Sequence, residues 1–420
     1  MSTEVEFVEI NKISVPVIFE EDKKLPIVSM QLVFLSGGSI EDGDTAGLAR
    51  FTSKILSEGV KGTSSADFAK ALEEKAINFG VSAGSETLVF ELSSLKEEFE
   101  FGVLMVEKVL KNPNISKEAF EKVYTQTQGI IFDKESDFDY VANVKLRSLM
   151  YENSSFGQPS LGTKESIQKI NIKKVDAFIK EHLDLSNLIV VVGGDIDKAQ
   201  LKGLLTKLLS SLRAGEKREL PFYDVSGTPK SETQIKQSEQ AYVYFAAPFF
   251  LKAANKDVYK AKVAGFILGE SGFGSRLMDA IRVDKGLAYS AYSRFSTEKS
   301  SSSFFGYLQT KNESKDEAIE IVKKVIKDFT AKGATQKELE QAKRFLLGSE
   351  PLRVETMSQR LSLAFHEYSR GLGLGYFKTE LKNIESLSLE ELNSFVKSHQ
   401  EINGLIFSIV TNDNSSKPQR

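Results

Sequence analysis

Two stretches of the chain follow the same pattern at a constant offset. Residues 170–189 read INIKKVDAFIKEHLDLSNLI, and residues 387–406, 217 positions later, read LSLEELNSFVKSHQEINGLI. In each copy, apolar residues recur at helical spacing and lead into an apolar run typical of a strand, predicted at 188–192 and 405–410. This period is far longer than the roughly 20–50 residues of a solenoid repeat. The sequence therefore predicts two duplicated domains.

The stretch 213–237 separates the two copies and has the composition of a linker. It is rich in charge, contains Pro221, Gly227 and Pro229, and shows little hydrophobic periodicity. We therefore predict an N-terminal domain at 1–212 and a C-terminal domain at 238–420.

The predicted elements of the first half come in runs of strands and runs of helices. The helices carry one apolar stripe, for example Phe99, Val103 and Val106. Elements that do not alternate strictly are typical of an α+β fold, in which helices cover a mixed sheet. We expect two α/β sandwich domains, each with a mixed, mainly antiparallel sheet covered by helices. The predicted strands are 14–19, 28–34, 80–83 and 88–92, and the predicted helices are 46–56, 65–78, 95–110 and 117–132.

The composition limits the class of protein. The chain has 420 residues, is 41% hydrophobic and 27% charged, and carries a formal net charge of -3. These values are typical of a water-soluble globular protein and give no reason to expect nucleic acid or membrane as a partner. The chain has no cysteine, which excludes disulfides and thiolate metal sites. No basic and apolar leader is visible, so we expect a cytoplasmic protein, or a periplasmic one if a signal peptide has been removed.

The histidines do not form a metal-binding pattern. His182 and His399 occupy matching positions in the two copies and are predicted to be structural. His366 precedes Glu367, but Arg370 stands where the second histidine of an H-E-x-x-H motif would be needed.

Residues 47–54, GLARFTSK, lie in a predicted helix and are followed by KGT at 61–63. Arg50 and Lys54 are four positions apart and therefore project from one face of that helix. Two positive charges on one face repel a dication, and neither side chain offers zinc a lone pair. An alternative interpretation treats both as ordinary polar residues of an exposed helix, with Lys54 pairing with Glu58.

These motifs, with four others in the same order, resemble the pitrilysin and mitochondrial processing peptidase family over almost the whole chain. In that family the helix reads G-L-A-H-x-x-E-H, an inverted zinc motif, and a K-G-T turn follows. Arg50, Ser53 and Lys54 stand at the positions of its two histidines and its glutamate. The resemblance implies a two-domain chain that pairs with another chain so that their halves enclose a chamber. The other matching segments are 36–42, 156–159, 161–167 and 193–196.

The resemblance also implies that every zinc ligand is missing here. The family's third ligand would fall in the helix at 119–133, where residues 122–132 contain no carboxylate and Ile131 stands near the expected position. Ser53 replaces the acid that would act as general base for a zinc-bound water. We therefore expect no metal and no cofactor in this chain, and zinc in a partner subunit.

Residues 274–290, GSRLMDAIRVDKGLAYS, resemble the family's C-terminal signature. In family members an arginine and a tyrosine seven positions apart face the zinc site across the chamber, and Arg282 and Tyr289 have that spacing. The resemblance implies that Arg282 hydrogen-bonds substrate carbonyls and that Tyr289 donates to the developing oxyanion, both in trans. The alternative is that Arg282 pairs with Asp279 or Glu270 and that Tyr289 is an ordinary strand residue.

The expected substrate is an extended peptide that adds a strand to an exposed sheet edge. By the resemblance, the strand at 87–92 and the turn before it correspond to the family's edge region. The glycine-rich stretch 269–274 lacks the Lys-Ser/Thr of a phosphate-binding loop. It is either a plain turn or a loop that touches substrate, as at this position in the family. The expected substrate-binding residues are therefore Ser85, Thr87, Leu88, Gly272 and Gly274.

Three functions remain open from the sequence. The chain is expected to be the non-zinc-binding subunit of a heterodimeric zinc metalloendopeptidase, inactive alone and active with a zinc-bearing paralogue. The first alternative is an inert scaffold, like the core subunits of a respiratory complex that resemble this family. The second is a peptide-holding homodimer that cleaves nothing.

Overall fold

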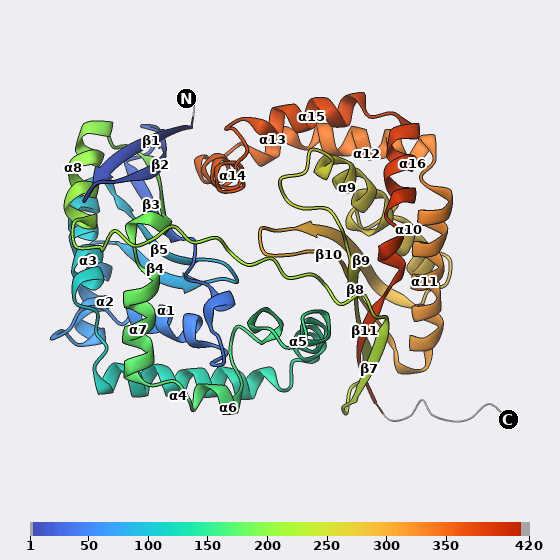
Figure 1. The fold of residues 1–420 in the computed structure, drawn as a ribbon, viewed down its shortest axis with the longest axis horizontal. Coiled ribbons are helices and arrows are strands. Elements are labelled where there is room, and N and C mark those ends of the chain that lie inside the picture. Colours follow the sequence, from blue (N-terminus) through green and yellow to red (C-terminus); the bar gives the residue numbers. More distant parts are fainter. Residues whose placement is uncertain (1–2, 413–420) are drawn as a thin grey trace. The chain divides into compact units, whose positions relative to one another are not determined.

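The computed structural model describes residues 3–412, which form two compact units, each built on one sheet (Figure 1). The first unit contains the chain up to Phe132, Gln158–Leu220 and Arg353–Ser369. The second contains Asp133–Gly157, Pro221–Leu352 and the chain from Arg370 onward. Each unit thus takes a segment from the other half of the sequence, which distinguishes these units from the predicted domains 1–212 and 238–420.

The first unit is built on a six-stranded sheet of order β1-β2-β6-β3-β5-β4. Its β2–β6 pair is parallel, and its other pairs are antiparallel. Met30, Leu32 and Phe34 alternate along one strand toward the face on which α1, α3 and α8 pack. The strands are β1 (Glu4–Ile10), β2 (Ile13–Glu21), β3 (Ile27–Phe34), β4 (Asn78–Ala83), β5 (Leu88–Leu95) and β6 (Leu188–Gly194). The helices are α1 (Leu48–Ser57), α2 (Ser65–Glu73), α3 (Phe99–Lys111), α4 (Lys117–Lys134), α6 (Lys164–Ile167), α7 (Ile172–His182), α8 (Lys198–Leu209) and α14 (Met357–Ser369).

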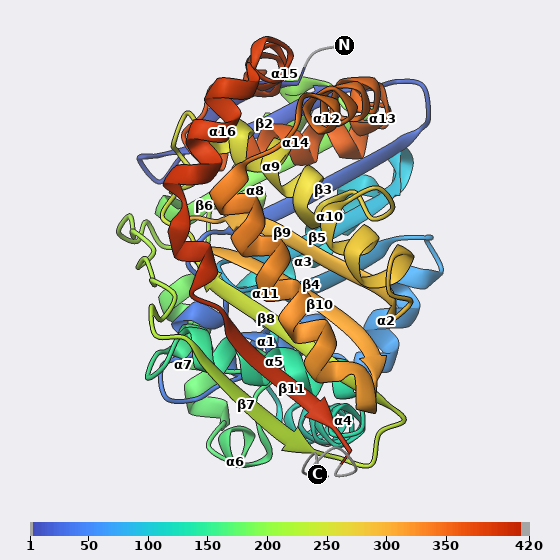
Figure 2. The same ribbon diagram turned by 90° about the vertical axis from the view of Figure 1, so that its right-hand side faces the viewer.

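The second unit is built on a five-stranded sheet of order β7-β11-β8-β10-β9. Its β7–β11 pair is parallel, and the other pairs are antiparallel. α11 and α16 lie over one face of this sheet (Figure 2), where they close the unit's main apolar core. The strands are β7 (Lys230–Ile235), β8 (Gln240–Pro248), β9 (Ala288–Thr297), β10 (Ser302–Lys311) and β11 (Ile406–Thr411). The helices are α5 (Phe138–Met150), α9 (Val258–Gly265), α10 (Arg276–Met278), α11 (Lys315–Lys332), α12 (Gln336–Gly348), α13 (Glu350–Arg353), α15 (Tyr376–Ser386) and α16 (Leu389–Ser398).

The predicted α+β class and the repeat are confirmed by these elements. The two repeated stretches form α7 followed by β6 and α16 followed by β11. In each sheet, the repeated strand (β6 or β11) pairs in parallel with one neighbour and antiparallel with the other. Among the described strands, this is the only parallel pair of its sheet. The two units therefore share one topology around their repeated strand.

Three predictions about elements were wrong. The predicted linker 213–237 includes β7, a strand of polar residues whose pairing with β11 could not be read from hydrophobic periodicity. The predicted helix at 65–78 ends at Glu73, because Ala76 adopts a positive φ of 51° and Asn78 begins β4. The strand expected at the sheet edge, 87–92, forms β5, which lies between β3 and β4. The open edge on that side of the sheet is β4.

Each half of the sequence contributes one helix to the unit that is built mainly from the other half. α5 comes from the first half of the sequence and packs on β8 and β11 of the second sheet. α14 comes from the second half and packs on β2 and β6 of the first sheet. Adding the repeat offset of 217 to the bounds of α5 gives 355–367, which overlaps α14, so the exchanged helices are equivalent elements of the repeat.

Each exchanged helix is held by a polar anchor as well as by apolar packing. On α5, the Asp139 carboxylate accepts hydrogen bonds from Tyr244 Oη at 3.0 Å and from Gln309 Nε2 at 2.8 Å. On α14, Leu361 and Ala364 pack in an apolar cluster with side chains of the sheet face opposite α3. Buried polar groups that find partners in this way fix one arrangement of a helix on a sheet.

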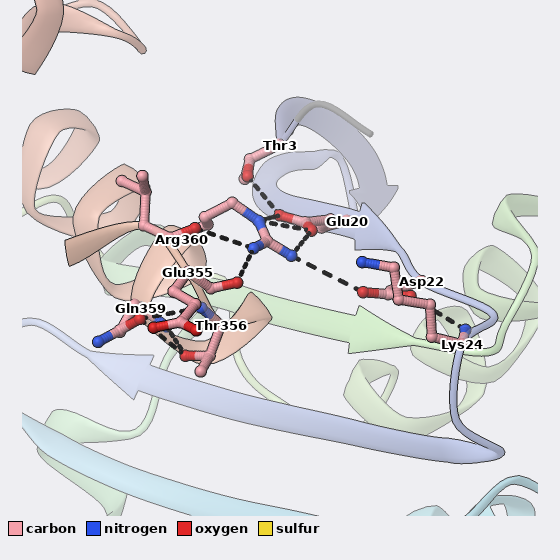
Figure 3. A network of polar contacts seen from close by, with 9 residues as sticks. Thr3, Glu20, Asp22, Lys24, Glu355, Thr356, Gln359 and Arg360 are labelled. Carbon is pink, nitrogen blue, oxygen red and sulfur yellow. Dashed lines mark hydrogen bonds and ion pairs between the residues drawn. The ribbon is translucent and has the colours of Figure 1, made fainter. Parts of the chain in front are cut away.

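Arg360 anchors α14 through a fully buried carboxylate, that of Glu20 on β2 (Figure 3). Its Nη2 and Nε lie 2.6 and 2.9 Å from Glu20 Oε1, and its Nη1 donates to the carbonyl oxygens of Val354 and Glu355. Thr3 Oγ1 donates to the second carboxylate oxygen at 2.7 Å. A planar guanidinium whose donors are all directed in this way is suited to a buried pair, because a single missing partner leaves a desolvated charge.

Within residues 3–412, no helix combines the length and the apolar character that crossing a membrane requires.

Substituting Arg360→Ala should lower the free energy of unfolding by about 3 kcal/mol, because it leaves the Glu20 carboxylate buried without its counter-charge. Urea unfolding followed by circular dichroism measures this, taken at the first transition. Arg370→Ala is the matched control: its side chain is 24% exposed, close to the 23% of Arg360, but its partner Glu298 is 55% exposed. That control should cost less than about 1 kcal/mol, and equal losses in the two variants would contradict a special role for the buried pair.

Candidate functional site

The helix at the predicted metal position is held at its start by a buried carboxylate. Asp42 accepts hydrogen bonds from the backbone N–H groups of Gly47 and Ala49, both at 2.7 Å. Gly47 has a φ of +92°, and a Cβ there would lie 2.9 Å from the carbonyl oxygen of Leu161. Glycine at position 47 is therefore required by backbone geometry and close packing, whether or not the helix binds a metal.

Burial raises the pKa of Asp42 to about 7, despite the two backbone hydrogen bonds that favour its ionised form. The desolvation of the carboxylate outweighs these bonds, and no basic side chain is among the groups that shift this pKa. The Asp42 carboxyl group therefore titrates near neutral pH beside the start of α1.

The three residues at the positions of the resembled zinc motif lie on α1, and none of them has the imidazole, carboxylate or thiolate that zinc prefers. Ser53 is buried, and its Oγ donates to the carbonyl oxygen of Arg50 at 2.8 Å. Arg50 is half-buried and Lys54 is exposed. The suggested pairing of Lys54 with Glu58 was wrong: the Glu58 carboxylate pairs with Lys122 on α4 at 2.7 Å. The helix thus keeps its polarity but offers cations and a hydroxyl in place of imidazole and carboxylate.

The helix that would supply the third ligand, α4, buries a strictly apolar or hydroxyl stripe. Ala119, Val123, Thr127 and Ile131 are its buried residues, spaced four positions apart. Thr127 Oγ1 is satisfied within the helix, since it donates to the carbonyl of Val123 at 2.8 Å. Across the described part of the chain, no group of three or more His, Asp or Glu side chains is arranged to hold a metal ion. These residues do not fit a zinc ion.

The two repeat-equivalent histidines make structural contacts, as predicted. His182 is buried against Phe178, and Arg218 lies 2.8 Å from its Nδ1. Burial, with the Arg218 charge, lowers the pKa of His182 to about 4, so the ring is neutral at physiological pH. His399 pairs through Nδ1 with Glu401 at 2.6 Å.

Arg282 and Tyr289 are brought together at the surface of the second unit. Arg282 lies on a single π-helical turn, Asp279–Val283, and Tyr289 lies at the start of β9. The guanidinium stacks on the Tyr289 ring with its Cζ 4.6 Å from the ring centroid. Among the described residues the Arg282 side chain has no ion-pair partner and no hydrogen-bond partner, so the alternative pairing with Asp279 or Glu270 is not observed.

A second aromatic ring, that of Phe273, also contacts the Arg282 guanidinium. The Phe273 centroid lies 4.5 Å from the guanidinium carbon, and 68% of this side chain is exposed. Phe273 is carried by the loop between Gly272 and Gly274, whose φ angles are +69° and +85°. The two predicted substrate-binding glycines therefore shape the loop that presents Phe273. Sequence reasoning missed Phe273, although a large aromatic residue between two glycines was the available signal.

A β-bulge sets the direction of Tyr289. The β9–β10 register shifts so that Ala288 opposes Thr310 while Ala291 opposes Leu308. Tyr289 and the next residue therefore share one partner position, an arrangement that bends an edge strand and redirects its side chains. The Tyr289 side chain is 81% exposed, although β9 is a strand of the sheet. The bulge explains why a tyrosine in a strand presents its ring to solvent beside Arg282.

The predicted substrate-binding residues of the first unit do not form an open edge. Leu88 is fully buried, and its backbone pairs with Phe34 on one side and Ala83 on the other. The carbonyl of Ser85 accepts a hydrogen bond from Ile40 N at 2.9 Å, so the turn is covered by the segment before α1. Leu88 thus has neither an exposed side chain nor a free backbone edge in this structure. Ser85 and Thr87 lie in a half-buried turn beside β4, where their role stays a prediction.

Comparison with known proteins gives two family matches, which together span most of the chain. Residues 16–164 match the model described as Insulinase (Peptidase family M16), and residues 169–346 match the one described as Peptidase M16 inactive domain. The chain is 42% identical over 409 residues to a Helicobacter pylori protein called "Non-peptidase homolog YmxG", covering 97% of this chain and 94% of that protein. It is 23% identical to a Bacillus subtilis protein called "Uncharacterized zinc protease YmxG", covering 95% and 94%.

Solved structures share the fold over the full length. A Pseudomonas fluorescens protein described as a peptidase M16 inactive domain superposes with a TM-score of 0.89 at 23% identity, covering 100% of both chains. A protease from Helicobacter pylori superposes with a TM-score of 0.82 at 16% identity, covering 97% of this chain and 100% of that one. At these identities the likeness concerns the fold alone.

The raised pKa of Asp42 predicts a specific pH dependence. Between pH 4 and 7 the folded state holds a proton that the unfolded state has released, so raising the pH lowers the free energy of unfolding. Relative to Asp42→Asn, which does not titrate, the wild-type protein should lose up to about 2 kcal/mol between pH 5 and pH 7. His182 contributes a slope of opposite sign to both proteins, and this contribution cancels in the difference. Parallel pH profiles from urea unfolding would contradict the assignment.

The residues at the zinc positions predict that the purified chain retains no stoichiometric zinc after equilibration with micromolar zinc and dialysis, since cationic and hydroxyl side chains do not replace imidazole. Mass spectrometry of the metal content should find far less than one zinc per chain. One tightly held zinc per chain would mean that other residues form a site.

Proposed function

This chain belongs to the M16 (insulinase) peptidase family, and on that premise we propose that it is the metal-free subunit of a two-chain zinc peptidase. In this proposal it binds an extended peptide and presents Arg282 and Tyr289 to a substrate held at the zinc of a paralogous subunit. By itself it cleaves no peptide.

The state of the two halves supports this division of labour. The first unit keeps the family's metal helix in place through Asp42 but carries Arg50, Ser53 and Lys54 at the ligand positions. The name of the Helicobacter pylori relative, a non-peptidase homologue, agrees with a chain that does not hydrolyse peptides alone. Loss of the metal ligands would account for a lack of peptide hydrolysis by the chain alone, but it does not by itself identify a function.

The main support for this function is the exposed pair of Arg282 and Tyr289 in the second unit. Tyr289 is 81% exposed and turned outward by a bulge, and Arg282 stacks on its ring without a carboxylate partner among the described residues. A guanidinium and a phenol at this spacing can donate hydrogen bonds to a peptide carbonyl and to the oxyanion that forms from it. Neither group needs to lie on the polypeptide that holds the metal.

We also propose that the peptide adds a strand to the sheet of the first unit, at the edge strand β4 and not at the strand 87–92 expected from the sequence. β4 has a single neighbour, β5, among the described strands, and its outer edge is the one that an extended peptide would meet. Backbone pairing of this kind gives affinity with little dependence on sequence. Ser85 and Thr87 flank the end of β4 rather than form the edge themselves.

An inert scaffold is the second candidate, and the name of the Helicobacter pylori relative fits it equally well. A scaffold has no use for an exposed Arg–Tyr pair, whereas a subunit that contacts substrate depends on it. The two candidates therefore predict different effects on peptide cleavage when these two side chains are changed.

In a complex reconstituted with the zinc-bearing M16 subunit from the same genome, Arg282→Ala and Tyr289→Phe should each lower kcat/KM for unfolded β-casein, roughly 100-fold if each donor acts on the oxyanion. Size-exclusion chromatography should show unchanged assembly. Lys285→Ala is the control, since this exposed lysine of the same segment pairs only loosely, 3.4 Å from Glu317. An equal loss in Lys285→Ala would indicate general charge steering, and full activity in both test variants would favour the scaffold.

A further inference from the structure

We propose that Phe273 is a positioning residue: together with Tyr289 it restricts the Arg282 guanidinium, so that the N–H donors of this group are held ready for a bound peptide. This inference rests on the proposed function, since it assigns a role in the same substrate contact. It concerns a residue that the sequence motifs around Arg282 do not mark.

The Arg282 guanidinium lies over two aromatic rings. Its carbon lies 4.5 Å from the Phe273 centroid and 4.6 Å from the Tyr289 centroid, both within the range of a cation–π contact. An arginine side chain at a surface otherwise samples many rotamers, and holding it for one hydrogen-bond geometry is unfavourable entropically. Contacts with two rings restrict this freedom before a substrate arrives.

The contacts with the two rings leave the N–H donors of Arg282 without hydrogen-bond partners among the described residues, 3–412. Since these donors lie in the plane of the group, they are open to a planar oxygen acceptor approaching from the edge, such as a peptide carbonyl. Both rings remain largely exposed, so that apolar surface is available next to that acceptor.

The loop that carries Phe273 is built to hold the ring there. Positive φ angles at Gly272 and Gly274 turn the chain on both sides of it. Ser275 Oγ donates to the carbonyl of Gly272 at 2.7 Å, and the next residue, Arg276, binds Glu338 through two nitrogens at 2.6 and 2.8 Å. A ring that is 68% exposed contributes little to the core, so its placement is explained better by its contact with Arg282 than by burial.

The first test is spectroscopic and needs no partner. In protein labelled selectively at arginine, the side-chain protons of Arg282, assigned by loss of the signal in Arg282→Lys, should be shifted upfield by the two rings. Phe273→Leu should remove a large part of this shift, Phe273→Trp should keep or enlarge it, and Phe250→Leu should leave it unchanged. Phe250 is the matched control, because it is also 68% exposed and lies in the same unit. An Arg282 shift that is insensitive to Phe273→Leu would overturn the proposal.

The second test is functional and uses the complex with the zinc-bearing subunit. Phe273→Leu should lower kcat/KM for unfolded β-casein by about 2- to 5-fold, the equivalent of one exposed cation–π contact. Phe273→Trp should restore it, and Phe250→Leu should have no effect. If Arg282→Ala impairs cleavage but Phe273→Leu does not, Phe273 does not position Arg282 and the proposed function stands. If Arg282→Ala has no effect either, the proposed function fails and this inference fails with it.

Discussion

The buried ion pair between Arg360 and Glu20 is the constraint on which the first unit depends. The two residues are separated by 340 positions, and the carboxylate has no exposed surface. A charge in that position is tolerable only with a counter-charge and with hydrogen bonds for its remaining lone pairs, which Arg360 and Thr3 supply. The first sheet is therefore complete only when α14, from the far half of the sequence, lies against it.

The second unit likewise depends on a helix from the other half of the sequence. α5 leaves the first half of the sequence and places Asp139 where Tyr244 and Gln309 can donate to it. Because the exchanged helices are equivalent elements of a repeat, the exchange is a property of the duplicated architecture and not of one local motif. Each unit then presents its own surface: a metal-type helix without ligands in the first, and the stacked Arg282 in the second.

Much of this was accessible from the sequence, for identifiable reasons. The repeat at a 217-residue offset gave the duplication, and motif order gave the positions of Arg50, Ser53, Lys54, Arg282 and Tyr289. Local patterns could not give the helix exchange, since an amphipathic helix has the same pattern whichever sheet it covers. The strand order was equally hidden: whether β4 or β5 forms the edge depends on pairings between distant segments, and β7 carries polar residues that look like a linker. Phe273 was missed because its importance comes from a contact with Arg282, nine positions away, that only the fold creates.

A chain that contributes to catalysis without holding the metal should be active only together with the zinc-bearing subunit. Cleavage of an unfolded protein should be followed for this chain alone, for the zinc-bearing subunit alone and for their mixture, with zinc quantified in each sample. We expect a metal-free and inactive chain whose addition raises the activity of the zinc subunit many-fold, with a chelator abolishing that activity. A mixture no more active than the zinc subunit by itself would contradict it.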